Sequence, residues 1–181
     1  GGAGIVLNGG TPLSLTITTT GDEVRFNGAV TLGSIVGINT TGGDILFTND
    51  SPIDSASGEH NDLTLNAGTG IVRFNEDLGA TQALGKLTIA AASQIIFGEA
   101  DSETSGSGTT GPVNLVNATS YVNLGSESVI TNGIVLNGGS STLTIQTTGD
   151  DLRFNGAVTL SSDVVLDTDN ADGTDTEGGQ I

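Results

Sequence analysis

Short apolar segments alternate with polar and glycine-rich segments along the whole chain. Short segments such as IVLN, LTIT and VRFN recur at strand-like spacing. In LTIT and VRFN apolar and polar residues alternate, which is typical of a β-strand because successive side chains point to opposite faces. No segment repeats its apolar residues at the 3.6-residue spacing of a helix over the length that a helix needs. The pattern therefore predicts an all-β protein with many short strands.

Two phrases occur twice in the chain. GIVLNGG occupies residues 4–10 and 133–139, and RFNGAVTL occupies residues 25–32 and 153–160. A degenerate third copy contains LTLNAGTGIVRFN, which aligns with LTITTTGDEVRFN and LTIQTTGDDLRFN. We therefore interpret residues 1–181 as one repetitive segment of a longer protein, with internal repeats near residues 4–32, 63–75 and 133–160.

The phenylalanines mark a shorter period. Each ends an apolar triplet such as Val24-Arg-Phe26, and with Leu124 filling one wide gap the intervals are about 21 to 30 residues, a period typical of solenoids. The first and third residues of a triplet share one face of a strand, so the ring points inward and Arg outward. We predict one interior ladder of Phe26, Phe47, Phe74, Phe97, Leu124 and Phe154.

Glycine and asparagine at the segment ends predict how the chain turns. Further apolar segments lie between the phenylalanines, which gives two to three strands per coil. Asn-Gly, Gly-Gly and Thr-Gly fit solenoid corners because Gly and Asn tolerate a left-handed backbone. Asn-Gly also favours hairpins, so an antiparallel meander is the alternative. The identity of distant copies favours a parallel β-helix, in which stacked coils place like residues on like residues.

Three phrases carry a family resemblance. LTLNAGTGIVRFN, ALGKLTIAA at residues 83–91 and FNGAVTL resemble the repeat regions of large exported bacterial surface proteins, of the filamentous-haemagglutinin-like and autotransporter-like β-solenoid kind. The resemblance implies a right-handed parallel β-helix, secreted to a cell surface or an extracellular fibre.

The charge of the chain excludes several partners. There are 21 acidic residues against 4 basic ones, and the formal net charge is -17. Nucleic-acid grooves and anionic membrane surfaces need clustered Lys and Arg, and no apolar run approaches the ~20 residues of a membrane helix. We therefore expect no nucleic-acid partner and no membrane-embedded segment. The chain has no Cys, which excludes disulfides and thiolate metal sites.

An enzyme is the rival class, because parallel β-helices also host polysaccharide lyases and hydrolases. Those reactions need basic groups that stabilise negative charge, or paired carboxylates that flank a sugar. One lysine, one histidine and three arginines within the repeats supply no converging set, and Tyr121 is the only tyrosine. We therefore expect a non-catalytic protein.

One acidic segment is the candidate metal site. The second long copy continues into DTDNADGTDTE at residues 167–177, which the first copy lacks. Carboxylate oxygens are the ligands that Ca²⁺ prefers, although the spacing only approximates an EF-hand loop. The alternative is a solvated acidic loop. No cofactor is required, and the candidate calcium ligands are Asp167, Asp169, Asp172, Asp175 and Glu177.

Two further polar segments, residues 49–62 and 99–111, read as loops inserted at corners of the coils. His60 in the first is interpreted as a solvated loop residue, with a metal ligand as the alternative, because its acidic neighbours lack ligand spacing. The repeated arginines, Arg25, Arg73 and Arg153, are interpreted as partners of nearby carboxylates, with a ligand-binding row as the alternative.

These observations predict a structural or adhesive component of a cell-surface or extracellular fibre or matrix. A calcium-dependent binding or surface-lattice-forming module is the alternative, and it depends on the acidic segment at residues 167–177. The expected partners are further copies or neighbouring repeats, which associate end to end, and a cell-surface or carbohydrate receptor.

Overall fold

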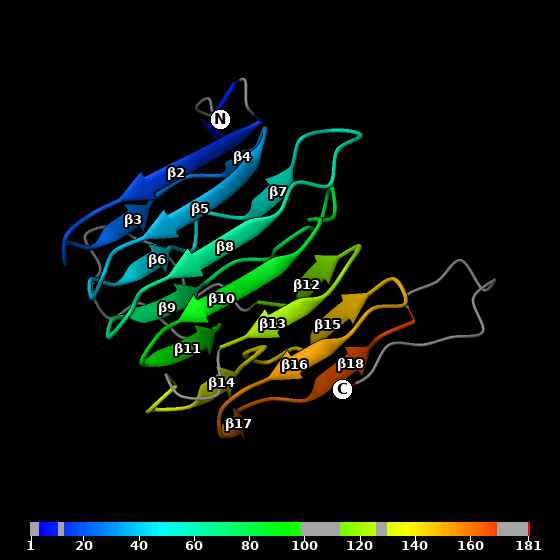
Figure 1. The fold of residues 1–181 in the computed structure, drawn as a ribbon. Helices are drawn as coiled ribbons and strands as arrows, with labels where there is room; N and C mark the ends of the chain where they lie inside the picture. Colours follow the sequence, from blue (N-terminus) through cyan, green and yellow to red (C-terminus); the bar gives the residue numbers. More distant parts are fainter. Residues whose placement is uncertain (1–3, 11–12, 99–112, 126–129, 170–180) are drawn as a thin grey trace.

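The computed structural model describes residues 4–10, 13–98, 113–125, 130–169 and 181. In this part of the chain there is no helix, and the strands form a parallel β-solenoid of about six turns (Figure 1). The predicted fold class is confirmed. Every pairing between two named strands is parallel, which excludes the antiparallel meander.

Each coil crosses three faces, A, B and C, in that order. Face A contains β1 (Ile5–Leu7), β4 (Val30–Leu32), β7 (Ile53–Ser55), β12 (Leu115–Ala118), β15 (Leu143–Thr147) and β18 (Val164–Asp167). Face B contains β2 (Ser14–Thr18), β5 (Ile35–Asn39), β8 (Leu63–Asn66), β10 (Leu87–Ala91), β13 (Val122–Leu124) and β16 (Leu152–Phe154). Face C contains β3 (Val24–Phe26), β6 (Ile45–Phe47), β9 (Ile71–Phe74), β11 (Gln94–Phe97), β14 (Ile134–Leu136) and β17 (Val158–Leu160).

Face A is interrupted in the fourth coil, where no named strand lies between β7 and β12. Two single residues replace it: Leu78 forms bridges with Ile53 and Val116, and Leu84 with Ala118. The side chains of Leu78 and Leu84 are fully buried. They maintain the apolar core while the chain between them bulges out, so the coil stacking continues past the interruption.

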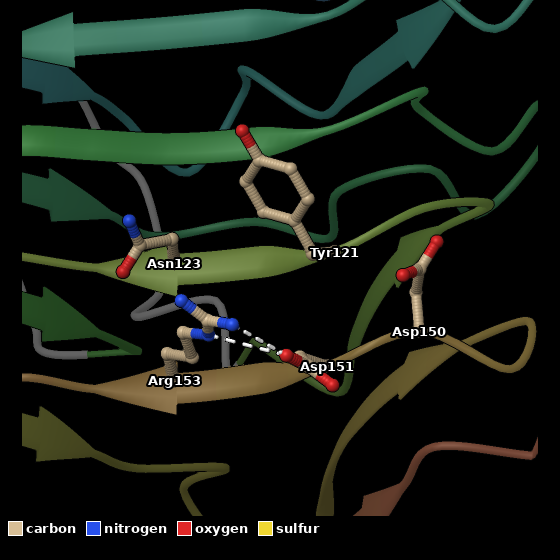
Figure 2. A pocket seen from close by; sticks show the side chains of 5 residues that line it. All are labelled: Tyr121, Asn123, Asp150, Asp151 and Arg153. Carbon is tan, nitrogen blue, oxygen red and sulfur yellow. Dashed lines mark hydrogen bonds and ion pairs between the residues drawn. The ribbon is translucent and has the colours of Figure 1, made fainter. Parts of the chain in front are cut away.

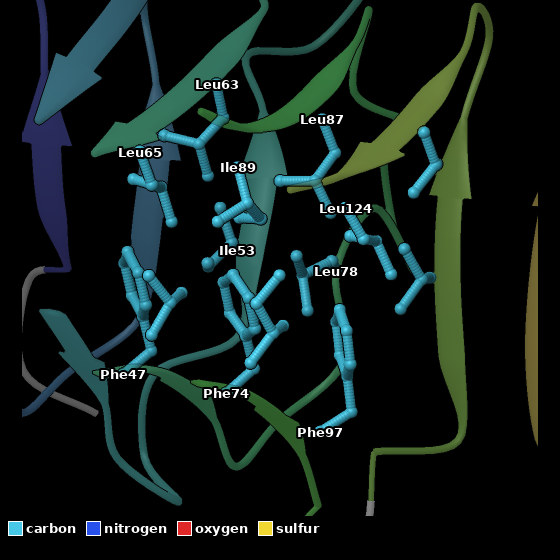
Figure 3. Packing of buried hydrophobic residues seen from close by; sticks show 14 of the residues in the cluster. Phe47, Ile53, Leu63, Leu65, Phe74, Leu78, Leu87, Ile89, Phe97 and Leu124 are labelled. Carbon is cyan, nitrogen blue, oxygen red and sulfur yellow. The ribbon is translucent and has the colours of Figure 1, made fainter. Parts of the chain in front are cut away.

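Four phenylalanine rings form an interior stack on face C, and Figure 3 shows three of them, Phe47, Phe74 and Phe97. Their centroids lie 4.8, 5.3 and 5.0 Å apart from Phe26 through Phe47 and Phe74 to Phe97, with interplanar angles of 6 to 16°. The strand registers pair the same residues. The predicted ladder is therefore confirmed for these four positions.

The last two positions of the predicted ladder are wrong. Phe97 pairs with Leu136, and Leu136 pairs with Leu160. Leu124 lies on face B, where it pairs with Ile89 and Phe154. The physical reason is the length of the fifth coil, which separates the stacked residues Gly98 and Asn137 by 39 positions and so exceeds the expected range of coil lengths.

The two long copies lie on different faces of the solenoid. The first copy of GIVLNGG forms β1 on face A, and the second copy forms β14 on face C. The first copy of RFNGAVTL forms β3 on face C and β4 on face A, whereas the second copy forms β16 on face B and β17 on face C. The second copy is thus rotated back by one face. The expectation that the long copies stack like on like is wrong.

The Asn-Gly-Gly corner forms the same hydrogen bond in both copies, although the copies lie on different faces. Asn8 Oδ1 accepts a hydrogen bond from Gly10 N at 2.9 Å, and Asn137 Oδ1 accepts one from Gly139 N at 2.9 Å. Both glycines have positive φ, 68° and 65°, which a residue with a Cβ adopts only with strain. The corner is therefore encoded within the copy itself.

A serine from the following coil supports each corner. Ser34 Oγ accepts a hydrogen bond from Gly9 N at 2.9 Å, and Ser162 Oγ accepts one from Gly138 N at 2.6 Å. Because each copy carries its own corner and its own supporting serine, the same corner forms after β1 on face A and after β14 on face C.

The segment at residues 49–62 is only partly a loop, contrary to expectation. Ile53–Ser55 forms strand β7, which pairs with β4, and Ile53 is buried in the core. The polar residues around this short apolar triplet conceal it in the sequence.

Candidate functional site

Face B carries a polar pocket near the C-terminal end of the solenoid. The pocket has a volume of about 320 Å³ and is lined by Tyr121, Asn123, Asp150, Asp151 and Arg153 (Figure 2). These residues come from β13, from β16 and from the turns that precede them. The site therefore lies between two adjacent strands of one sheet.

Strand register explains why these side chains meet. Val122 pairs with Leu152 and Asn123 with Arg153. Leu152 and Val122 point into the core, so Asn123 and Arg153 point outward side by side. The backbone N–H of Val122 donates to the carbonyl of Asp151 at 3.1 Å, which fixes the start of one strand against the other.

The charges of the pocket are partly neutralised. Arg153 Nη2 lies 2.7 Å from Asp151 Oδ2 and Arg153 Nε lies 3.2 Å from the same oxygen. Asp150 Oδ2 accepts a hydrogen bond from Ser120 Oγ at 3.0 Å. Asp150 is exposed and keeps the pocket acidic on the side away from Arg153.

Tyr121 supplies the aromatic surface of the site. It is partly buried, and Lys86 Nζ lies 5.2 Å from the centroid of its ring, within the range of a cation–π contact. Ring, amide, carboxylates and guanidinium together offer a stacking surface with hydrogen-bond donors and acceptors. Such a set suits a neutral polyhydroxylated ligand, because hydroxyl groups both donate and accept.

The interpretation of the arginines as carboxylate partners is confirmed for two of the three. Arg25 Nε lies 2.7 Å from Glu23 Oε1, and Arg153 pairs with Asp151. In both cases the partner is two residues earlier in the chain and lies on the same side of the strand. Such exposed pairs stabilise the fold only weakly.

The calcium hypothesis falls mainly outside the described residues, where Asp172, Asp175 and Glu177 lie. Asp167 ends β18, and its Oδ1 accepts a hydrogen bond from Asp169 N at 3.0 Å. In the part of the chain that the structure describes, no group of three or more His, Asp or Glu side chains could hold a metal ion. The hypothesis stays a prediction.

His60 is exposed in the turn after β7. Its Nδ1 lies 3.1 Å from the carbonyl oxygen of Ala83 and 3.3 Å from Gln82 Nε2. Gln82 Oε1 also accepts a hydrogen bond from Gly58 N at 3.2 Å. His60 therefore ties its own turn to the bulge of the fourth coil.

Glu76 lies in an environment that perturbs its carboxyl group. Burial raises the pKa of Glu76 above its ordinary value of 4.5, and the nearby charge of Asp77 raises it further. Asp77 itself is held in place, because its Oδ1 accepts hydrogen bonds from the backbone N–H groups of Asn114 and Leu115 at 2.7 and 3.0 Å. Glu76 therefore resists ionisation at the corner that leads into the fourth coil.

Comparisons with known proteins do not assign the chain to a family. No family model matches the chain, and no curated protein and no solved structure matches it. The described residues also form no helix that is long and apolar enough to cross a membrane. The function is therefore argued from the fold and the surface alone.

Sequence reasoning did not find the pocket. Alternation along the strands identifies Asn123 and Arg153 as outward residues, but only the register between β13 and β16 brings them together. A usable signal was present: subtracting the polar segment at residues 99–111 from the interval between Phe97 and Leu136 leaves a coil of ordinary length. That subtraction would have placed Leu136 on face C and Leu124 on face B.

Proposed function

We propose that the protein is a structural component of a cell-surface or extracellular fibre or matrix and is not a catalyst. The observation that carries the proposal is the continuity of the sheets on faces B and C and of the core that all three faces share. The fully buried residues Leu65, Leu87 and Leu124 belong to three successive coils of one apolar cluster. Each coil buries its apolar side chains against its neighbours, which is how solenoids form extended, rigid bodies.

Charge and composition support an exposed structural role. The net charge of -17 favours solubility and opposes unspecific lateral association. The core does not depend on disulfides, because the chain has no Cys.

Immunogold electron microscopy of intact source cells tests this proposal. An antibody against this chain should label fibres or matrix outside the cell, with a strain that lacks the gene as the control. Labelling confined to the cell interior would overturn the proposed function.

A second function, adhesion to carbohydrate, is favoured by the Tyr121 pocket. A sugar ring can stack on Tyr121 while Asn123 and Asp150 bind its hydroxyl groups. Arg153 is already paired with Asp151, so the ligand that fits is neutral, not anionic.

Glycan-array binding with the fluorescently labelled chain tests this second function. Tyr121→Ala and Asn123→Ala should each abolish binding to neutral oligosaccharides. Thr64→Ala is the control, because Thr64 is an exposed residue of the same face on β8. Equal binding by all variants, or no binding by the wild type, would refute the adhesive function.

A further inference from the structure

Lys86, Tyr121 and Asp151 form one outward row across face B. Each of them comes directly before a strand: Lys86 before β10, Tyr121 before β13 and Asp151 before β16. The first residues of these strands pair with one another and are buried, so the residues that precede them lie side by side and point outward. Tyr121 therefore has a cation on one side and a carboxylate on the other.

Backbone hydrogen bonds hold Lys86 and Tyr121 in place. The carbonyl of Tyr121 accepts a hydrogen bond from the N–H of Leu87 at 3.2 Å, and the carbonyl of Lys86 accepts one from the N–H of Leu63 at 2.8 Å. Strands β10 and β13 each pair with a neighbouring strand on both sides. The orientation of the Tyr121 ring therefore depends on its side-chain contacts.

The charges of this row favour one orientation of the Tyr121 ring. The face of an aromatic ring is negative, so an ammonium group attracts it and a carboxylate repels it. Lys86 Nζ lies 5.2 Å from the ring centroid. Figure 2 shows the ring directed away from Asp151 and Arg153, toward the green strand β10. The ring therefore lies where both neighbouring charges favour it.

Lys86 is available for this contact because no carboxylate neutralises it. Arg25 and Arg153 each pair with a carboxylate, whereas no carboxylate of the described residues lies within ion-pair distance of Lys86. Asp151 binds both Nε and Nη2 of Arg153, so the guanidinium does not compete for the ring. The ammonium group contacts Tyr121, and the guanidinium contacts Asp151.

This orientation of the ring leaves the pocket open. The pocket, about 320 Å³ in volume, is lined by Tyr121 and by Asp151 and Arg153 on the opposite side, and Lys86 is not among its lining residues. Rotation of the ring toward Asp151 would place it over Arg153 and fill this space. Lys86 occupies one face of the ring, so the other face is the one that a sugar can stack on.

We propose that Lys86 is a positioning residue of this pocket: its ammonium group holds the Tyr121 ring on the β10 side and so keeps the space beside the ring open for a neutral sugar. The proposal rests on the second proposed function, adhesion to carbohydrate, and adds a residue outside the pocket that sets its affinity. A ring already held in the binding orientation binds more tightly, because less freedom is lost when the ligand binds.

The motion of the ring tests the positioning without any ligand. Tyr121 is the only tyrosine and the chain has no Trp, so its fluorescence reports on this ring alone. In Lys86→Gln the fast component of the fluorescence anisotropy decay, which reports side-chain motion, should increase in amplitude. Lys86→Arg should restore the wild-type decay, because a guanidinium also binds ring faces. Arg25→Gln is the matched control: it removes the same charge from face C and should leave the decay unchanged.

Titration of the same variants on an array of neutral oligosaccharides tests the consequence for binding. Lys86→Gln should weaken binding about two- to fivefold, the ratio that corresponds to a cation–π contact at an exposed site. Lys86→Arg should restore the wild-type affinity, and Arg25→Gln should bind like the wild type. All three variants should keep the wild-type strand content by circular dichroism, which separates a change of ring orientation from a loss of the fold.

Three results would overturn the positioning role: wild-type ring motion in Lys86→Gln, wild-type affinity in Lys86→Gln, or a Lys86→Arg variant that behaves like Lys86→Gln. A wild type that binds no neutral oligosaccharide would instead refute the adhesive function. The ring-motion measurement needs no ligand, so failure of the positioning is distinguishable from failure of the proposed function.

Discussion

Truncating the central ring of the phenylalanine stack tests the coil register directly. Phe74 is 0% exposed and lies between two rings, with centroid distances of 5.3 Å to Phe47 and 5.0 Å to Phe97. Phe74→Ala removes one buried ring and two stacking contacts at once. The coils on both sides are held by their own backbone pairing, so the space cannot close freely.

The expected loss of stability follows from these contacts. Core Phe→Ala substitutions cost about 3 to 5 kcal/mol, and each aromatic pair contributes about 0.5 to 1.5 kcal/mol beyond its buried area. Because Phe74 has two ring partners and no exposed surface, we expect a loss near the upper limit, about 4 to 5 kcal/mol. Phe74→Leu should cost about 1 to 2 kcal/mol, because leucine fills the corresponding position on β14.

Urea unfolding followed by far-ultraviolet circular dichroism measures these differences. Phe154→Ala is the matched control: Phe154 is partly exposed, and its strand pairs it with Leu124, not with another ring. The comparison uses the midpoint shift at unchanged denaturant slope. The register would be refuted by a loss in Phe74→Ala no larger than that in Phe154→Ala.

Three further predictions concern Glu76, Thr40 and the effect of a chelator. Glu76→Gln should raise the melting temperature at pH 7, because the raised pKa of Glu76 makes its ionised form unfavourable in the folded state. The gain should vanish below about pH 4, where the wild-type carboxyl group is protonated in both the folded and the unfolded state. An equal gain at both pH values would contradict this prediction. Thr40→Val should lower the free energy of unfolding in urea by about 1 to 3 kcal/mol, because Thr40 Oγ1 is buried and donates a hydrogen bond to the carbonyl of Gly43. Thr19→Val is the control and should lower it less, because the hydrogen bond of Thr19 to the Asp22 carbonyl, 2.6 Å long, is exposed. Equal losses would refute the role of burial. A chelator should leave the melting temperature unchanged, and a large decrease would favour the calcium-dependent module.

The sequence was sufficient to predict the architecture but not the full register. Period-two alternation, glycine-rich corners and a repeat of solenoid length all arise from local rules, and the fold class follows from them. The position of each strand around the axis depends instead on the summed length of every preceding turn. The long fifth coil therefore moved Leu124 and Phe154 from the expected face C to face B.

Surface function was harder to predict for the same reason. An outward residue gains its neighbours from the coils above and below, which are 20 or more positions away in the sequence. Leu46 illustrates the consequence: it lies between Ile45 and Phe47, which point into the core, so alternation predicts an exposed side chain. Leu46 is nevertheless 7% exposed, which no local pattern indicates.

The rotation of the second copy explains why two nearly identical segments carry different surfaces. Arg25 and Arg153 occupy the same place in the repeat, and each pairs with an acidic residue two positions earlier. On face C, Arg25 has Leu46 as its neighbour. On face B, Arg153 has Asn123 as its neighbour and shares a pocket with Tyr121. The pocket is therefore produced by the position of the copy around the axis and not by the repeat itself.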